Sequence, residues 1–168
     1  MEEKKTSAAY RALKAVVKAL FPKMQVEGLE NIPEGGAVIV GNNAHAYGPI
    51  GVELFLGGSR YTWCAAEMMS LKEVPPYAFQ DFWSMKPRYT HLFYRILSYL
   101  IAPLCVLVFN SANTVPVYRD ARVMITFRRT LRLLREGNSI VIFPEHNAPR
   151  NNIVYDFQER FIDLGRMY

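Results

Sequence analysis

The chain has 168 residues, of which 51% are hydrophobic and 21% are charged. This length suits one domain with a substantial hydrophobic core, and the composition excludes an intrinsically disordered chain. The formal net charge of +5 favours an anionic partner, which leaves a lipid surface, a phosphorylated substrate and nucleic acid as alternatives.

The N-terminal segment 1–24 is predicted to contain a basic amphipathic helix over residues 8–20. Its apolar face carries Ala9, Leu13, Val16, Val17 and Leu20, and its opposite face carries Arg11, Lys14 and Lys18. This pattern fits two interpretations, a peripheral membrane anchor and a surface helix that packs on its own domain. The proline of Phe21-Pro22 is expected to end the helix.

Residues 25–168 are predicted to form a single α/β domain with a mostly parallel central sheet flanked by helices. Strands are expected at residues 26–32, 37–40, 61–66, 113–119 and 140–143, and helices at residues 45–56, 121–136 and 157–168. The strand 37–40 is expected to be fully buried, because it is an uninterrupted apolar run. Alternating strands and helices favour a parallel sheet, whose strand carboxyl ends face the ligand crevice.

Two adjoining segments in the middle of the chain have an unusual composition. Residues 67–96 are rich in proline and aromatic side chains and are predicted to form a loop-and-helix insertion. Residues 97–109 are almost wholly apolar, but about 13 residues are too few to cross a hydrocarbon core that requires roughly 20. This second segment is interpreted either as a buried helix or as a segment that contacts a membrane interface or an acyl chain.

The helix predicted at residues 121–136 has two distinct faces. Its inward face is expected to carry Phe127, Leu131 and Leu134, and its outer face Arg128, Arg132 and Arg135. Gly137 supplies the expected helix stop. The arginine row is interpreted as a solvated face, with contact to anionic headgroups as the alternative.

The two cysteines, Cys64 and Cys105, both lie in apolar or aromatic surroundings. Reduced cysteine behaves as a small hydrophobic residue in such places, so both are predicted to be structural, in a reducing compartment. Neither lies at a spacing typical of a zinc site, so we expect no metal.

Polar residues follow two of the predicted strands at the point where each strand ends. Strand 37–40 is followed by Asn43-Ala44-His45. Strand 140–143 ends at Phe143 and is followed by Pro144-Glu145-His146. Between them lies the block Val115-Pro116-Val117-Tyr118-Arg119. Two strand ends that each deliver a titratable group to a loop predict an active site.

These three blocks, in their order and spacing over roughly residues 25–165, resemble those of the glycerolipid (lysophosphatidic-acid type) acyltransferase family. The family blocks are Asn-His-x-x-x-x-Asp, Val-Pro-Val-x-Arg and Phe-Pro-Glu-Gly-Thr-Arg. The resemblance implies transfer of a fatty acyl group from a thioester, on coenzyme A or an acyl-carrier protein, to a hydroxyl of a phosphorylated glycerol or lysophospholipid. It also implies a cytoplasmic protein, peripheral to the membrane, that takes part in phospholipid synthesis or remodelling without a bound cofactor.

The resemblance assigns a role to four residues. His45 is the expected general base, because an alcohol must lose its proton as it attacks the thioester carbonyl. Arg119 matches the family's phosphate-binding arginine, whose planar guanidinium suits such an anion. Glu145 matches the glutamate that helps to hold the acceptor, and Arg150 is expected to replace the arginine of the third block.

The sequence departs from the family at several motif positions. Ile50 stands where the family has its aspartate, and His146 and Ala148 stand where the third block has glycine and arginine. The family aspartate orients the catalytic histidine, so another carboxylate must replace it; the candidates are Glu53, Glu67, Asp120 and Glu145. A second hypothesis is therefore a catalytically weak or inactive relative that binds lipid. A third hypothesis is nucleic-acid binding through the segment that carries Arg128, Arg129, Arg132 and Arg135, but it leaves the strand-end blocks without a role. The domain is also expected to lack the last strand or strands of the family fold.

Overall fold

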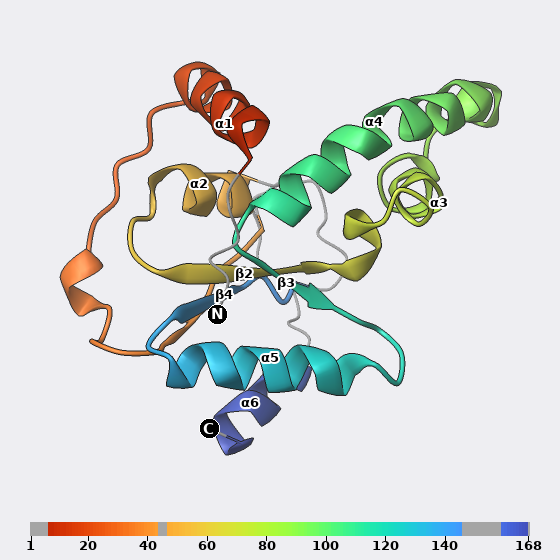
Figure 1. The fold of residues 1–168 in the computed structure, drawn as a ribbon. Helices are drawn as coiled ribbons and strands as arrows, with labels where there is room; N and C mark the ends of the chain where they lie inside the picture. Colours follow the sequence, from red (N-terminus) through yellow and green to blue (C-terminus); the bar gives the residue numbers. More distant parts are fainter. Residues whose placement is uncertain (1–6, 44–46, 146–158, 168) are drawn as a thin grey trace.

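A computed structural model describes residues 7–43, 47–145 and 159–167 of the chain. It has an α/β fold in which helices flank a four-stranded, all-parallel sheet, so the predicted fold class is confirmed (Figure 1). The order of the strands across the sheet is β1-β4-β2-β3. Their bounds are Val38–Val40 for β1, Arg60–Ala65 for β2, Thr114–Val117 for β3 and Ser139–Ile142 for β4.

The helices cover both faces of the sheet. They are α1 (Ala8–Leu20), α2 (Tyr47–Phe55), α3 (Val74–Ala78), α4 (His91–Ser111), α5 (Val123–Arg135) and α6 (Ile162–Met167). Figure 1 shows α2 and α4 on one face and α5 and α6 on the other. The chain crosses the sheet in one direction from β1 to β3 and then returns to β4, so right-handed crossovers place α5 opposite α2 and α4.

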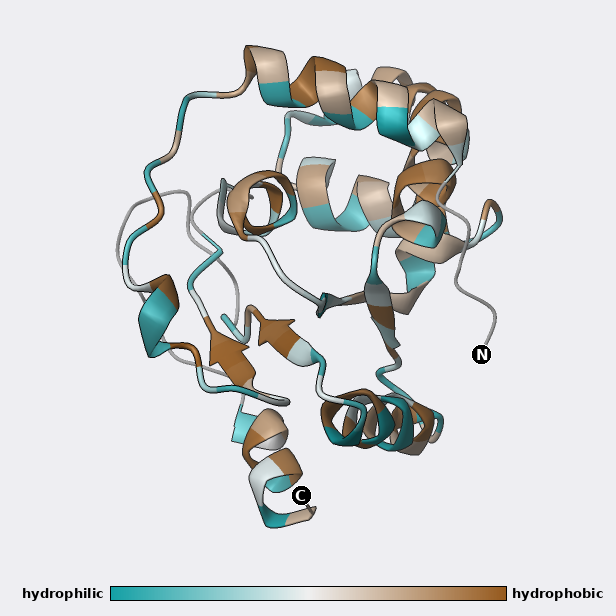
Figure 2. Cartoon of the chain, turned by 60° about the vertical axis from the view of Figure 1, so that its left-hand side comes forward, coloured by the Kyte–Doolittle hydropathy of each residue, from teal (hydrophilic) through white to brown (hydrophobic). Residues whose placement is uncertain are grey.

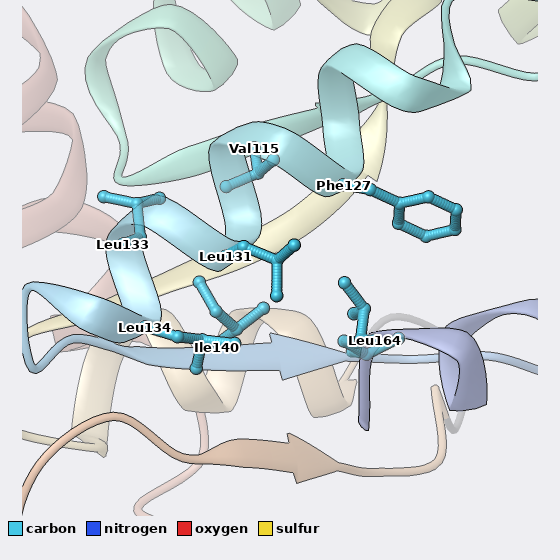
Figure 3. Close-up of a cluster of buried hydrophobic side chains, with 8 residues drawn as sticks. Val115, Phe127, Leu131, Leu133, Leu134, Ile140 and Leu164 are labelled. Carbon is cyan, nitrogen blue, oxygen red and sulfur yellow. The ribbon is translucent and has the colours of Figure 1, made fainter. Parts of the chain in front are cut away.

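The main core lies between α5 and the sheet, where the helical periodicity predicted it. Phe127, Leu131 and Leu134 are buried and pack with Val115 and Ile140 of the sheet (Figure 3). Burial of each such side chain stabilises the fold by about 1.5–3 kcal/mol. The arginines predicted on the outer face are exposed, and Figure 2 shows α5 with brown and teal on different sides.

Two predictions for the first part of the domain are wrong. Residues 26–32 do not form a strand; Leu29–Asn31 forms a 3-10 turn instead, after Gly28 with a φ of 77°. Strand β1 is also not fully buried, because Val38 and Val40 are 40% and 41% exposed. The exposure of β1 has a simple reason: it lies at the end of the sheet, and no described strand pairs with its outer side.

The apolar segment predicted at residues 97–109 belongs to a longer helix. Helix α4 has 21 residues, and residues 88–111 are long and apolar enough to cross a membrane by length and composition. The prediction that this segment is too short is therefore wrong. Burial is also limited to one side of the helix, where Ser98 and Ala102 are 1% and 3% exposed. Ala102 packs against Val74 and Ala78 of α3.

Helix α1 has the predicted bounds and contacts the domain through polar groups. The Tyr10 hydroxyl donates a hydrogen bond of 2.8 Å to Oε1 of Glu53, and Lys14 Nζ lies 2.5 Å from the same oxygen. Lys14 belongs to the predicted polar face, so this face is the one that contacts the domain. Val16 and Leu20, from the predicted apolar face, are 56% and 82% exposed. The contacts with Glu53 thus set the orientation of α1.

The helix predicted at residues 157–168 is described over residues 159–167. It begins with a 3-10 turn at Glu159–Phe161 and continues as α6, while residues 157, 158 and 168 lie outside the described part. Leu164 is 1% exposed and anchors α6 in the core.

The cysteines do not form a disulfide, and burial raises the pKa of the Cys105 thiol.

Candidate active site

Each strand of the sheet is followed by a polar side chain at its carboxyl end. Asn43 follows β1, Glu145 follows β4, Glu67 follows β2 and Arg119 follows β3. Because all the strands are parallel, these carboxyl ends meet at one edge of the sheet, where α/β proteins bind their ligands. The strand order places the residues along that edge in the sequence Asn43, Glu145, Glu67 and Arg119.

The first and third blocks are in direct contact at this edge. The backbone N–H of Asn43 donates a hydrogen bond of 2.7 Å to Oε2 of Glu145, across 102 positions of the sequence. The contact forms because β1 pairs with β4, and the N–H of Gly41 continues that ladder to the carbonyl of Ile142 at 3.0 Å. The carboxylate of Glu145 therefore holds the backbone of the loop that follows β1.

Phe143 of the third block packs against Gly41 and Gly48, which lie on either side of the first block in the sequence. A Cβ added at Gly48 would lie 2.9 Å from Cε1 of the Phe143 ring and 2.5 Å from the carbonyl oxygen of Asn42. A Cβ added at Gly41 would lie 3.2 Å from the same ring atom. The ring thus occupies space that exists because both positions lack a side chain, and it couples the start of α2 to the end of β4.

Arg119 lies beside an aromatic side chain of the insertion. Its Nη2 donates a hydrogen bond of 3.3 Å to the Tyr77 hydroxyl, and its guanidinium carbon lies 5.4 Å from the centre of the Tyr77 ring. Burial, followed by the charge of Asp81, raises the pKa of Tyr77, so the phenol is neutral. Within the described ranges Arg119 forms no ion pair with a carboxylate, which leaves its charge available to an anionic ligand.

A cavity of about 660 Å³ adjoins Arg119 and Tyr77. Its charged lining consists of Lys72, Arg119 and Arg122 together with Glu67, Glu73, Asp81 and Asp120. Arg122 and Asp120 neutralise each other through a contact of 2.8 Å. The lining therefore offers both cations and hydrogen-bond acceptors, which fits a ligand that combines an anionic group with hydroxyls.

Two buried acceptor atoms at this edge have no hydrogen-bond partner among the described residues. They are Oε2 of Glu67, which belongs to a residue of the cavity wall, and Oδ1 of Asn43. Buried polar atoms are rarely left unpaired, because each one costs about 1–3 kcal/mol. A ligand with a hydroxyl or amine donor would satisfy such an atom.

The described structure separates the four carboxylates named as replacements for the family aspartate. Glu53 is engaged by Tyr10 and Lys14, and it lines a second cavity beside Arg60, which begins β2 at the opposite edge of the sheet. Asp120 is exposed and bound to Arg122, whose hydrogen bonds lower the pKa of the Asp120 carboxyl. Asp120 also lines the cavity, where Arg122 engages it. Glu67 and Glu145 are the two at the candidate site that form no ion pair within the described residues.

Other residues of the predicted site are outside the described ranges. They are His45, His146, Ala148 and Arg150, so their assigned roles stay predictions. Ile50, at the position of the family aspartate, lies in α2 and is 37% exposed. In the part of the chain that the structure describes, no group of three or more histidine, cysteine, aspartate or glutamate side chains is arranged to hold a metal ion.

No pattern in the sequence indicated Tyr77, because it lies in the aperiodic insertion at residues 67–96. Its neighbour in the cavity, Glu67, was named only as one of four alternatives for a missing acid. The wall of the cavity thus depends on a segment whose structure the hydrophobic pattern did not predict. No protein-family model, curated protein or solved structure matches the chain.

Proposed function

We propose that the chain is an O-acyltransferase, which moves a fatty acyl group from a thioester to the hydroxyl of a phosphorylated glycerol or lysophospholipid. The donor is an acyl group on coenzyme A or an acyl-carrier protein. The observation that carries the proposal is the hydrogen bond between Asn43 and Glu145, at the sheet edge that also bears Arg119. This contact supports a single substrate site to which the first, second and third blocks all contribute.

The acceptor binds in the cavity beside Arg119. The guanidinium of Arg119, without a carboxylate partner in the described structure, holds the phosphate of the acceptor. The unpaired oxygen of Glu67 accepts a hydrogen bond from an acceptor hydroxyl. The cavity volume of about 660 Å³ lies within the range of roughly 300–1,000 Å³ that small-molecule sites occupy.

His45 acts as the general base in the proposed reaction. It removes the proton of the acceptor hydroxyl while the oxygen attacks the thioester carbonyl carbon. The new C–O bond forms, the C–S bond breaks, and the leaving thiolate receives the proton from the imidazolium. Glu145 fixes the loop that leads to His45 through the Asn43 N–H, and Arg150 provides a further contact to the acceptor phosphate.

The test of this proposal is release of free thiol from an acyl-coenzyme A with glycerol 3-phosphate or a lysophosphatidic acid as acceptor. We expect His45→Ala to lower kcat by about 10²-fold or more, the range typical of general-base removal. Arg119→Ala is expected to raise the KM for the phosphorylated acceptor. Arg128→Ala, an exposed arginine on the outer face of α5, is the matched control and should leave both constants unchanged. Equal thiol release by the wild type and His45→Ala would contradict acyl transfer.

A second candidate function is the binding of lysophospholipid without turnover. The observation in its favour is Ile50, which places an apolar side chain on α2 where the family has an acid. This candidate predicts saturable binding of lysophosphatidic acid, weakened by Arg119→Ala, with no thiol release by the wild type. Thiol release that depends on His45 excludes it.

The proposal includes a cytoplasmic location at the membrane surface, where phospholipid synthesis and remodelling take place. The basic net charge of the chain and its exposed apolar side chains support contact with a membrane surface.

A further inference from the structure

Helix α4 has its large apolar side chains on the outside and its small side chains on the inside. The side that faces α3 carries Ser98 and Ala102, which are 1% and 3% exposed. The opposite side, called here the α4 outer face, carries Leu92, Phe93, Ile96, Tyr99, Leu100 and Leu104, at 49–73% exposure. In a helix that faces water this distribution is reversed.

The α4 outer face is continuous along the helix. Its members recur three or four positions apart, so they form one stripe rather than scattered exposed residues. Just before the helix start, Tyr89 and Met85 are also 87% and 93% exposed. Figure 1 shows that α4 runs outward past the sheet, so this end lies away from the body of the domain. A contiguous apolar surface of this kind marks an interaction site.

The charged residues that flank the α4 outer face in the sequence are positive. No acidic residue lies between Asp81 and Asp120 in the sequence, whereas this interval contains Lys86, Arg88 and Arg95. Arg95 is exposed on the helix, with its guanidinium carbon 5.2 Å from the centre of the Phe79 ring. Apolar side chains bordered by lysine, arginine and tyrosine complement a bilayer that contains anionic lipid.

We propose that the α4 outer face inserts into the boundary between headgroups and acyl chains of an anionic bilayer, with the helix lying in the plane of the membrane. The helix lies in the plane rather than crossing the bilayer, because its inner side is packed against Val74 and Ala78 of α3 and lipid cannot surround it. The basic side chains at Lys86, Arg88 and Arg95 contact the lipid phosphates. The inference deepens the peripheral location that belongs to the proposed function, and it does not depend on acyl transfer.

Helix α1 makes a weaker candidate for the same role. Its Tyr10 and Lys14 are turned to Glu53, and Lys18 lies 5.4 Å from the centre of the Phe55 ring. Two large apolar side chains of α1, Val16 and Leu20, are exposed, against six on the α4 outer face. The structure thus assigns membrane insertion to α4.

The test is co-sedimentation of the purified protein with vesicles of phosphatidylcholine that contain phosphatidylglycerol, compared with vesicles of phosphatidylcholine alone. The variant Leu92→Glu/Leu100→Glu places two carboxylates on the α4 outer face. We expect it to lower the partition coefficient for the anionic vesicles by about tenfold or more, since apolar area and charge attraction both fall. The matched control is Met124→Glu/Ile125→Glu on α5, whose side chains are 43% and 52% exposed on the other face of the sheet. It should change the coefficient less than twofold by the same physical reasoning.

Three outcomes would overturn the inference. One is unchanged vesicle binding by Leu92→Glu/Leu100→Glu. Another is loss of binding in Leu20→Glu with binding retained in the α4 variant, which would assign insertion to α1. In the third, the wild type is a dimer that does not bind vesicles, and the α4 variant is a monomer. A second copy of the chain would then cover this face.

The folded state and the reaction are measured separately. The substituted side chains are exposed, so the thermal unfolding of Leu92→Glu/Leu100→Glu should follow that of the wild type. Thiol release with soluble glycerol 3-phosphate is expected to survive in this variant, because neither residue lines the acceptor cavity. Vesicle binding that Leu92→Glu/Leu100→Glu weakens, by a wild type that releases no thiol, would support the α4 assignment and contradict the proposed reaction.

Discussion

Removal of the Glu145 carboxylate is expected to destabilise the folded state through the loop after β1. In Glu145→Ala the backbone N–H of Asn43 loses its acceptor at 2.7 Å, and this contact is partly buried. A hydrogen bond to a charged group contributes roughly 1.5–3 kcal/mol, and partial access of water lowers the expected loss to about 1–2 kcal/mol. Glu145→Gln retains an acceptor oxygen without the charge, so its cost should be about half as large.

Urea unfolding measures this difference. We expect the midpoint to fall in the order wild type, Glu145→Gln, Glu145→Ala, with an unchanged dependence on denaturant concentration. For a chain of this size the melting temperature should drop by about 2–4 °C for each kcal/mol. Glu34→Ala, at an exposed turn, is the control and should unfold like the wild type. The same midpoint for Glu145→Ala as for Glu34→Ala would refute the assignment of Glu145 as the group that holds this loop.

Two further substitutions test close packing at the site and the attachment of α1. Gly48→Ala should lower the free energy of unfolding by about 1–3 kcal/mol and reduce thiol release, because its Cβ would lie 2.5 Å from the carbonyl oxygen of Asn42. The control is Gly57→Ala, whose Cβ would meet open space and should leave both quantities unchanged. Equal effects of the two substitutions would contradict close packing at Gly48. Burial, followed by the hydrogen bond to Glu53, raises the pKa of Tyr10 above its ordinary value. The folded state therefore keeps this proton longer than the unfolded state, so its stabilising effect is complete below pH ~10 and is lost as the pH rises further. Tyr10→Phe should flatten the alkaline fall in the free energy of unfolding, and an unchanged slope would contradict the contact.

The sequence predicted those parts of the fold in which local periodicity and tertiary packing agree. Phe127, Leu131 and Leu134 recur at helical spacing and all face the core, so α5 was predicted with its correct inner face. The strand ends at Asn43 and Glu145 were predicted as one site because parallel strands share an edge. Their direct contact was not predictable, because it requires β4 to lie beside β1, and chain order alone does not show this arrangement.

The prediction of the fold was less successful where the apolar pattern does not show which side of an element is buried. In α4 nearly every position is apolar, so the sequence does not show which side packs on α3; the small Ser98 and Ala102 face inward, because they allow close approach. Residues 26–32 are apolar enough for a strand, but Gly28 in the left-handed region starts a turn there. Tyr77 entered the site from an aperiodic segment, and its contact with Arg119 depends on tertiary packing alone.

The position of β1 sets the order in which the molecule assembles. In the described sheet its one partner is β4, and Val38 aligns with Ile140 across most of the chain. Pairing over such a separation closes a long loop, and contacts of this kind form slowly. During synthesis, β1 therefore cannot pair until β4 has left the ribosome, and the apolar edge of β1 stays exposed until then. The loop after β1 acquires its final geometry late in folding, so we expect nascent chains that end before residue 139 to hold β2 and β3 together while β1 remains a binding site for chaperones.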